Sequence, residues 1–244
     1  MIPDLPLARW GLSGSISEVE SGNRNRVFRL ITADGTSFAL KSTQHSEASL
    51  AWLGALHAAA RGAGLLVPGY MTARDGALNC HGWTCEPWVE GKGFEAGDLV
   101  AVRDRVRQFH RLSDSVPRRP GVAGAADIVH GNAPGTVFPD DMPPDVVERC
   151  LLSWQAVSGN PVGVVHGDIN AGNLIWSDGG VPVLIDWDEA RRDYLFFDDI
   201  QVTPPTGGKN PEQLRAALAW EVFASWHAEP ERARQLADDL LNGG

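Results

Sequence analysis

The feature that most constrains this chain is the run of residues 166–173, which reads HGDINAGN, followed thirteen residues later by Asp186. Asp168 and Asn173 are five positions apart, and Asp186 comes directly after the apolar run 183–185, which is typical of a short buried strand. A loop carboxylate can accept the hydrogen of an attacking hydroxyl, whereas an amide oxygen and a second carboxylate are hard ligands that suit Mg²⁺. We therefore expect Asp168 to be a catalytic base and Asn173 and Asp186 to hold magnesium, which predicts phosphoryl transfer.

Two other interpretations of this run compete with that hypothesis. An ordinary loop with a capping aspartate would leave the matched Asn173 and Asp186 as coincidences. A hydrolytic metal site that uses His166 and Asp168 would need further ligands, and the sequence contains no H-x-H or H-E-x-x-H partner. Phosphoryl transfer is the hypothesis that gives all three oxygen-bearing residues a task.

Length and composition favour a cytoplasmic protein with a large core. A chain of 244 residues with 43% hydrophobic content can fill one large domain or two lobes. Its three cysteines form no C-x-x-C pair, so neither a disulfide framework nor a thiolate zinc site is expected. No uncharged apolar run approaches the roughly 18 residues that cross a bilayer, and no basic segment precedes an apolar one at the amino terminus. We expect no membrane partner.

The net charge of −10 is unevenly distributed. Residues 1–91 contain 7 basic and 8 acidic side chains, while residues 92–244 contain 14 basic and 23 acidic ones. Such a field repels nucleic acid and attracts a cationic small molecule. The alternative is that the acidic surplus only keeps the surface soluble.

The first ninety residues read mostly as sheet with one helix. Residues 27–31 and 37–41 flank an Asp-Gly turn and predict a hairpin. Ser46, Glu47 and a helical spacing of apolar residues predict a helix that ends near Arg61. Residues 69–73 and 78–86 are expected to be further strands.

A break near Gly91 divides the chain into a nucleotide-binding lobe, residues 1–91, and a catalytic and substrate-binding lobe, residues 92–244. The Gly- and Pro-rich stretch 115–144 predicts a long irregular connection, a kind of segment that is usually functional or mobile and here could cover a substrate. The remaining patterns predict helices at 99–112, 144–157, 212–228 and 231–241, and short buried strands at 162–165 and 181–185.

Two residues of the first lobe are candidates for holding a nucleotide. Lys41 ends a predicted strand, from which its ammonium could reach the α and β phosphates. Glu47, on the first turn of the next helix, could hold that ammonium through an ion pair. The alternatives are a solvated edge charge for Lys41 and a favourable helix-terminal acid for Glu47.

A glycine-containing loop and a hinge complete the nucleotide hypothesis. Gly22, Asn23 and Asn25 tolerate positive φ, so their turn could direct backbone N–H groups at phosphate oxygens, although a plain hairpin loop has the same composition. Near the lobe boundary, Glu86 and Trp88 could meet an adenine. Tryptophans in such places are more often part of a core or a lobe interface than base stackers.

Other conspicuous residues have structural interpretations that we favour. His110 lies on an apolar helical face and is expected to be a buried, hydrogen-bonded histidine. Trp220 and Trp226 recur at helical spacing and are expected to pack in a core, with a substrate pocket as the alternative. Asp198 and Asp199 precede an apolar residue, where a structural carboxylate would accept backbone N–H groups.

With these residues in place, the chain resembles the aminoglycoside phosphotransferase and choline kinase family, which is related to protein kinases. The resemblance rests on the glycine-containing loop, Lys41, Glu47, the hinge at 86–91, HGDINAGN and the motif at 185–188. It implies an α+β, bilobal, protein-kinase-like fold with a small five-stranded antiparallel sheet in the first lobe and a mostly helical second lobe. It also implies an ATP or GTP site, and Asp199 is similar to the family carboxylate that braces the catalytic loop.

The leading hypothesis is therefore a Mg-dependent kinase that transfers the γ-phosphate of ATP or GTP to a hydroxyl of a small, amine-bearing acceptor. Trp187 stands where a protein kinase has the Phe of D-F-G, and no A-P-E segment follows, which disfavours a protein substrate. The alternative is a catalytically silent pseudokinase that binds nucleotide and serves as an interaction module.

Overall fold

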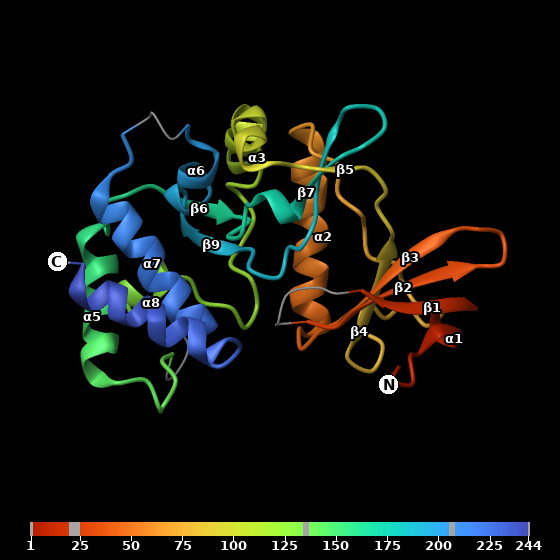
Figure 1. Ribbon diagram of the computed structural model, residues 1–244, viewed down its shortest axis with the longest axis horizontal. Coiled ribbons are helices and arrows are strands. Elements are labelled where there is room, and N and C mark those ends of the chain that lie inside the picture. The colour runs from red at the N-terminus through yellow and green to blue at the C-terminus, as the bar shows by residue number, and fades with distance from the viewer. Residues whose placement is uncertain (1, 20–24, 134–136, 205–207, 244) are drawn as a thin grey trace. The chain divides into compact units, whose positions relative to one another are not determined.

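The computed structural model describes residues 2–19, 25–133, 137–204 and 208–243 (Figure 1). The chain forms two compact units. The first contains Met1–Gly93 and Leu174–Ile185, and the second contains Phe94–Asn173 and Asp186–Gly244. No described helix is both long enough and apolar enough to cross a bilayer.

The first unit is built on an antiparallel sheet in the order β1-β2-β3-β4. Its strands are β1 (Gly14–Val19), β2 (Val27–Thr32), β3 (Ser37–Ser42) and β4 (Trp83–Pro87). The predicted hairpin is confirmed as β2 and β3, and Gly35 in its turn has a φ of 84°, which an L side chain rarely adopts. Strand alternation puts Phe28, Leu30 and Leu40 into a buried cluster, which they share with Trp10 of the short helix α1 (Leu7–Trp10).

The strand prediction for residues 69–73 is wrong, and the one for 78–86 is correct only at its end. Met71 donates one hydrogen bond to Cys85 O at 2.7 Å, but no ladder continues from it. Backbone at His81 and Gly82 has positive φ, so the chain turns there instead of extending. Among the described residues the sheet thus has four strands, not the five that the resemblance implied.

Helix α2 (Glu47–Gly62) confirms the prediction for this segment. Ser46 caps it by accepting the N–H of Ser49 at 3.3 Å, and Leu50, Leu53 and Leu56 form its buried stripe. A small second sheet follows, in the order β5-β7-β8, made of β5 (Lys92–Gly93), β7 (Leu174–Trp176) and β8 (Pro182–Leu184).

The second unit is mostly helical. Its helices are η1 (Ala96–Val102), α3 (Arg103–Leu112), α4 (Ala125–Val129), α5 (Pro144–Ala156), η2 (Ala171–Asn173), α6 (Phe196–Val202), α7 (Pro211–Ser225) and α8 (Pro230–Asn242). The four long helix predictions are confirmed, although the first begins as 3-10 turns. The irregular stretch 115–144 contains α4, which the sequence did not reveal.

The core of this unit joins α5, α6 and α7 through aromatic side chains, and α8 adds Ala233, Ala237 and Leu240. Trp154 and Trp220 lie with their ring centroids 6.1 Å apart, and Trp226 is also buried, so the packing interpretation of these tryptophans is confirmed. Beside this core, β6 (Val162–Val165) pairs antiparallel with β9 (Arg191–Tyr194), which places Val165 opposite Arg191. That ladder fixes the start of the motif loop.

Candidate active site

The loop that starts at His166 is held by a buried carboxylate from α6. Asp198 is fully buried and accepts the backbone N–H of His166 at 2.8 Å and of Gly167 at 2.9 Å. Its Oδ2 also receives Nε2 of His110 at 3.0 Å. His110 is thus the buried, hydrogen-bonded histidine that the sequence predicted, and Asp198 is the expected structural carboxylate.

Burial by itself raises the pKa of Asp198, but the hydrogen bond from His110, the nearby imidazoles and the Gly167 N–H outweigh it. The pKa of Asp198 therefore lies below its ordinary value, and this carboxylate is ionised in the folded protein. A full negative charge strengthens the hydrogen bonds that it accepts from the loop.

Asp198, and not Asp199, is the carboxylate that braces the catalytic loop, so the expectation for Asp199 is wrong. Asp199 is partly exposed and faces Arg107, whose Nε lies 3.6 Å from its Oδ1. The two aspartates are consecutive on α6 (Phe196–Val202), so their side chains point about 100° apart around the helix axis. Only Asp198 points toward the loop.

Gly167 lets the loop pass very close to the segment that follows Asp186. Its φ is 88°, and a Cβ at this position would lie 2.7 Å from Glu189 O and 2.6 Å from Nη1 of Arg191. Any side chain there would collide with backbone. Glycine at this position therefore brings residues 167 and 189 into direct contact.

Both oxygens of the Asp168 carboxylate accept hydrogen bonds from side-chain amides of its own loop. Nδ2 of Asn170 donates to Oδ1 at 2.9 Å, and Nδ2 of Asn173 donates to Oδ2 at 2.8 Å and to the Asp168 carbonyl at 2.9 Å. The 3-10 turn η2 makes this possible, because Oδ1 of Asn170 accepts the N–H of Gly172 and of Asn173. The five-residue spacing of Asp168 and Asn173 thus has a local geometric cause.

A hairpin returns the chain from Asn173 toward Asp186. Leu174 of β7 pairs with Leu184 of β8, so Asn173 and Asp186 flank the same end of this hairpin. Asp186 has a φ of 60°, and His81 is the only other described non-glycine residue with positive φ. Such strained backbone in a carboxylate-bearing residue is characteristic of functional sites.

The residue after Asp186 packs directly on the loop. The ring of Trp187 is buried and makes an edge contact with His166, with centroids 4.7 Å apart, and with Phe109 at 5.5 Å. The β6–β9 ladder thus ends at the loop residues 166–173, and Asp168, Asn173 and Asp186 all belong to the second unit.

Sequence reasoning missed three side chains that shape this site. Arg119 is buried and donates from Nη1 to the carbonyls of Asp188 at 2.7 Å and Ala190 at 2.8 Å. Arg191 is equally buried and is paired through Nε with Asp193 at 2.7 Å. Asn170 lay within the motif and could have been found from its Asx-turn chemistry. Arg119, in a Gly- and Pro-rich stretch, had no such signal.

The first unit places Lys41 on β3, half-buried, opposite Val27 of β2 and Thr84 of β4. Its predicted ion pair with Glu47 is not formed among the described residues. Both oxygens of Glu47 instead accept backbone N–H groups, from Leu78 at 3.0 Å and from Asn79 at 2.7 Å. An exposed carboxylate at the start of α2 thus braces the turn before β4.

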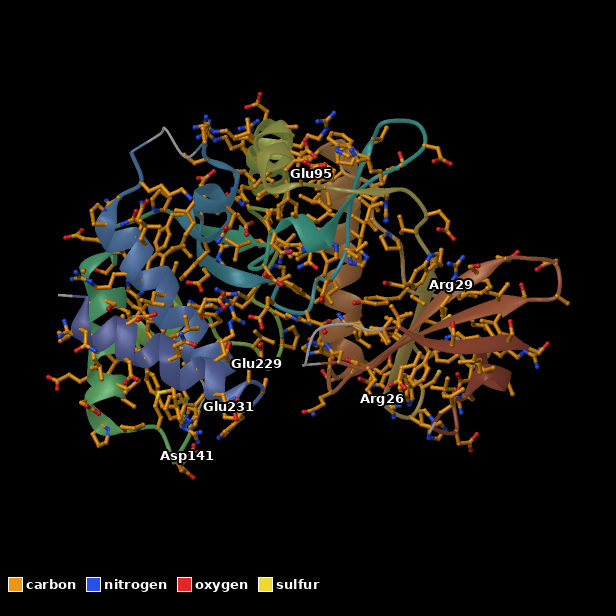
Figure 2. The ribbon with its side chains drawn as sticks, viewed as in Figure 1. Arg26, Arg29, Glu95, Asp141, Glu229 and Glu231 are labelled. Carbon is orange, nitrogen blue, oxygen red and sulfur yellow. The ribbon has the colours of Figure 1, made fainter. Side chains whose placement is uncertain are left out.

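The other residues predicted to contact the nucleotide lie in or next to strands β2 and β4, or outside the described residues. Glu86 lies in β4 opposite Ala39, and Trp88 follows it with its N–H bonded to Ser37 O at 3.0 Å. Arg29 is labelled in Figure 2. Its guanidinium lies 4.8 Å from the centre of the Trp88 ring and pairs with Glu90. Gly22 and Asn23 lie outside the described residues, whereas Asn25 is described just before β2.

The donor chemistry at Asn173 fits a magnesium ligand. Because Nδ2 is committed to Asp168, the amide oxygen is oriented away from that carboxylate, and it accepts no hydrogen bond within the part of the chain that the structure describes. No group of three or more His, Cys, Asp or Glu suited to a metal occurs among those residues. The expected ligands are of another kind, one amide oxygen from Asn173 and one carboxylate from Asp186.

A loop aspartate after a strand, an asparagine five residues later and an aspartate after the next hairpin define the class of phosphoryl-transfer enzymes with a kinase-like fold. A family model described as the phosphotransferase enzyme family, APH, matches residues 15–236. The chain belongs to this family, and the resemblance drawn from its motifs is confirmed.

Solved structures confirm the α+β fold class. Amicoumacin kinase hAmiN, solved with AMP-PNP, Ca²⁺ and Ami, is similar with a TM-score of 0.63 and 12% identity, over 93% of this chain and 88% of that one. Aminoglycoside phosphotransferase APH(4)-Ia gives 0.59 and 15%, over 94% of each chain. Macrolide 2'-phosphotransferase MphH from Brachybacterium faecium gives 0.54 and 16%, over 97% and 96%. No curated protein matches the sequence significantly.

Proposed function

We propose that this protein is a Mg-dependent kinase that transfers the γ-phosphate of ATP or GTP to a hydroxyl of a small, amine-bearing molecule in the cytoplasm. The observation that carries the proposal is that two side-chain amides hydrogen-bond to the Asp168 carboxylate. A carboxylate held on both oxygens by Asn170 and Asn173 has one fixed orientation, as a base that must meet a hydroxyl requires.

The Asp168 carboxylate can accept a further hydrogen bond from an acceptor hydroxyl. Each carboxylate oxygen can accept about two hydrogen bonds, and each oxygen here receives one side-chain N–H. The remaining acceptor positions can take the O–H of an incoming alcohol. In a loose phosphoryl-transfer transition state the alcohol loses its proton late, so Asp168 chiefly orients the hydroxyl and takes the proton near the end.

Asn173 and Asp186 are the residues that we propose to hold magnesium, and Lys41 the one that meets the nucleotide phosphates. Bound magnesium neutralises charge on the transferred phosphoryl group. Gly22, Asn23 and Asn25 would cover the phosphates, and the backbone at Glu86 and Trp88 would meet the base. The similar fold of amicoumacin kinase, solved with AMP-PNP and Ca²⁺, supports a nucleotide and a divalent ion.

The proposal that the acceptor bears an amine rests on the negative charge of residues 92–244. Residues 92–244 carry nine of the ten excess negative charges, a field that attracts cations. Proteins of the same fold have been solved with spectinomycin and with hygromycin B, which supports a small molecule as acceptor. An acidic protein of this kind is not expected to bind nucleic acid.

The test is a screen of aminoglycosides and metabolic amino alcohols for transfer of labelled γ-phosphate from ATP or GTP. With the best acceptor, Asp168→Asn should lower kcat by about 10²–10⁴-fold while nucleotide binding survives. Asp178→Asn is the matched control, because it removes the same charge from an exposed position in the β7–β8 turn. Unchanged turnover in Asp168→Asn would disprove the base assignment. Nucleotide binding indifferent to loss of both Asn173 and Asp186 would favour a silent nucleotide-binding module.

A further inference from the structure

The turn at residues 187–190, directly after Asp186, has all four of its carbonyls bonded to buried arginines. Nη1 of Arg119 donates to three of these carbonyls, which belong to Trp187 at 3.4 Å, Asp188 at 2.7 Å and Ala190 at 2.8 Å. Nη1 of Arg191 donates to the fourth, the carbonyl of Glu189, at 3.0 Å. The turn is thus fastened to two side chains that lie outside it.

Both guanidinium groups are shielded from water. Arg119 is 2% exposed and Arg191 is 1% exposed. A buried charge is costly unless it is hydrogen-bonded, and a bond from a charged donor is stronger than one from a neutral donor. The two arginines therefore fix the turn more firmly than the backbone bond that closes it, from the N–H of Ala190 to the carbonyl of Trp187 at 3.1 Å, could do alone.

Asp186 is the residue whose geometry depends on this turn. Its φ of 60° is a conformation that a residue other than glycine keeps only where the surrounding structure enforces it. The backbone angles of Asp186 set the direction in which its carboxylate leaves the chain, and the turn begins at the next residue. If the turn relaxed, Asp186 could return to an unstrained conformation and its carboxylate would point elsewhere.

We infer that Arg119 is a positioning residue for magnesium, which acts on Asp186 through the backbone of the 187–190 turn and touches neither the ion nor the nucleotide. This inference rests on the proposed function, because that function assigns Asp186 to magnesium. Arg119 lies in the connection 113–124 between α3 (Arg103–Leu112) and α4 (Ala125–Val129). Part of the irregular stretch that the sequence predicted to cover a substrate thus orients a metal ligand.

Arg119 is the residue to replace, because Arg191 has other tasks. Arg191 pairs with Asp193 at 2.7 Å, and its guanidinium lies 3.6 Å from the centre of the Trp220 ring, so its replacement would disturb the core. Arg119→Met removes the donors to the turn but keeps a long unbranched side chain. Arg119→Lys keeps a charged donor on a shorter side chain, and serves as the conservative variant.

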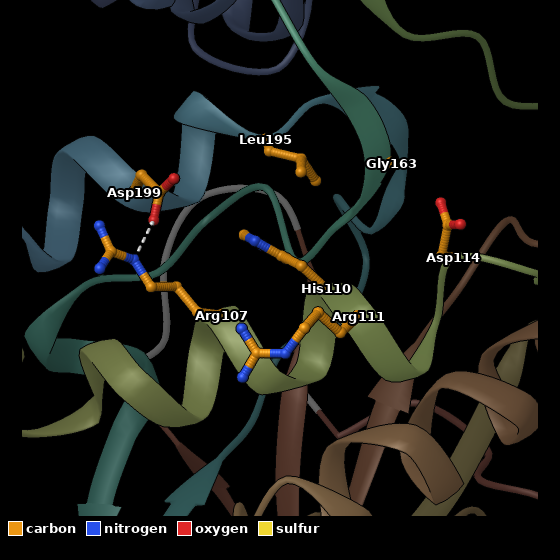
Figure 3. A pocket seen from close by; sticks show the side chains of 7 residues that line it. All are labelled: Arg107, His110, Arg111, Asp114, Gly163, Leu195 and Asp199. Atoms are coloured by element: carbon orange, nitrogen blue, oxygen red, sulfur yellow. Dashed lines mark ion pairs between the residues drawn. The ribbon is translucent and has the colours of Figure 1, made fainter.

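Arg192→Met is the matched control. Arg192 donates to the carbonyls of Asp114 at 3.0 Å and Val116 at 3.4 Å, which belong to the same connection 113–124. Asp114 is labelled in Figure 3. Replacing Arg192 thus loosens this connection without removing a donor to the 187–190 turn. Thermal melting of all variants separates a general loss of stability from a loss of ligand geometry.

The first measurement is titration of the full chain with Mn²⁺ in the presence of ADP, followed by electron paramagnetic resonance. Arg119→Met should weaken Mn²⁺ binding about tenfold or more, as is common when a group that orients a metal ligand is removed. Arg119→Lys should recover part of this affinity, and Arg192→Met should bind Mn²⁺ like the unmodified protein. The affinity for ADP without metal should be the same in all of them.

The second measurement is hydrogen exchange at the turn, in protein free of metal and nucleotide. The N–H of Ala190 closes the turn, so it should exchange several-fold faster in Arg119→Met than in the unmodified protein or in Arg192→Met. If Arg119→Met does not fold, the same comparison is made with Arg119→Lys, for which a smaller change in the same direction is expected.

Three results would overturn the inference: Mn²⁺ affinity unchanged in both Arg119 variants, an equal loss of affinity in Arg192→Met, or unchanged exchange at Ala190. Each of them leaves the proposed function standing, because the unmodified protein still binds the ion. Absence of Mn²⁺ binding in the unmodified protein would contradict the proposed function, and this inference with it. The two failures are therefore distinguishable.

Discussion

Two carboxylates in this protein do the same kind of work in different units. Asp198 in the second unit holds the N–H groups of residues 166 and 167, and Glu47 in the first holds those of residues 78 and 79. Asp198 is fully buried and has an imidazole partner, whereas Glu47 is exposed. A buried brace cannot be replaced by water, but an exposed one can. The loop of Asp168 is therefore the more rigidly built of the two.

The largest effect is expected at the buried brace. Asp198→Ala leaves two loop N–H groups and His110 without an acceptor, and should lower the free energy of unfolding by about 3–5 kcal/mol. Urea denaturation measures it, and Asp199→Ala, on the same helix, should change it by less than about 1 kcal/mol. Equal losses in both variants would contradict the assignment of the brace.

The brace also predicts a pH dependence. Because the pKa of Asp198 is lowered in the folded state, its contribution to stability is present above the ordinary Asp value of 3.8 and is lost as pH falls through the lower folded value. Unfolding experiments from pH 5 downward should thus lose stability more steeply in the parent than in Asp198→Asn. Parallel curves would show that Asp198 does not titrate with folding.

Two of the three buried thiols, Cys85 in the first unit and Cys150 in the second, allow the two cores to be compared. Burial raises the pKa of Cys85, in the first unit, and of Cys150, in the second, to about 12. At pH 8 their thiolate fraction, and hence their rate of reaction with a disulfide reagent, should be about a thousandfold below that of an ordinary thiol. Their stabilising effect is present below the ordinary value of 9.0 and is lost as pH rises toward 12. Urea-unfolded protein is the control and should react at once. Rapid labelling of Cys85 or Cys150 in the folded protein would show that its unit is loosely packed.

A smaller effect is expected at the exposed brace. Glu47→Gln keeps an acceptor oxygen for the 78–79 turn but removes the charge, and should cost about 1 kcal/mol or less. Glu47→Ala should cost somewhat more than Glu47→Gln, and both should be milder than Asp198→Ala. A loss above about 3 kcal/mol in Glu47→Gln would remove the contrast between the units.

The smallest effect concerns a buried hydroxyl of the second unit. The Tyr194 O–H is buried and has no hydrogen-bond partner among the described residues. Tyr194→Phe should therefore leave stability unchanged or raise it by up to about 1 kcal/mol. Trp154→Phe is the contrasting variant, because it removes the bond from Nε1 to Ala216 O at 3.1 Å and should destabilise. A clear loss in Tyr194→Phe would mean that the hydroxyl is bonded.

The parts of the fold that were predictable are those encoded over short stretches of chain. The Asp-Gly hairpin and the start of α2 at Ser46 depend on residues that are adjacent in the sequence. The amphipathic helices could also be predicted from the sequence, because their hydrophobic period repeats over three or four turns.

What was missed depends on partners far along the chain or on very short elements. The partner of Glu47 lies 31 residues away, and the choice between Asp198 and Asp199 depends on the rotational phase of a seven-residue helix. Strands β5 and β7 have two and three residues, too few for a period to show. Arg119 reaches carbonyls 69 and 71 residues further on.

The central claim is that Asn173 and Asp186 present their oxygens to one divalent ion beside Asp168. Titration of Mn²⁺ with ADP present, followed by electron paramagnetic resonance, tests it directly. We predict that Asn173→Ala and Asp186→Asn each weaken Mn²⁺ binding about tenfold or more, while Asp178→Asn binds it like the unmodified protein. Equal Mn²⁺ affinity in all four proteins would contradict the account.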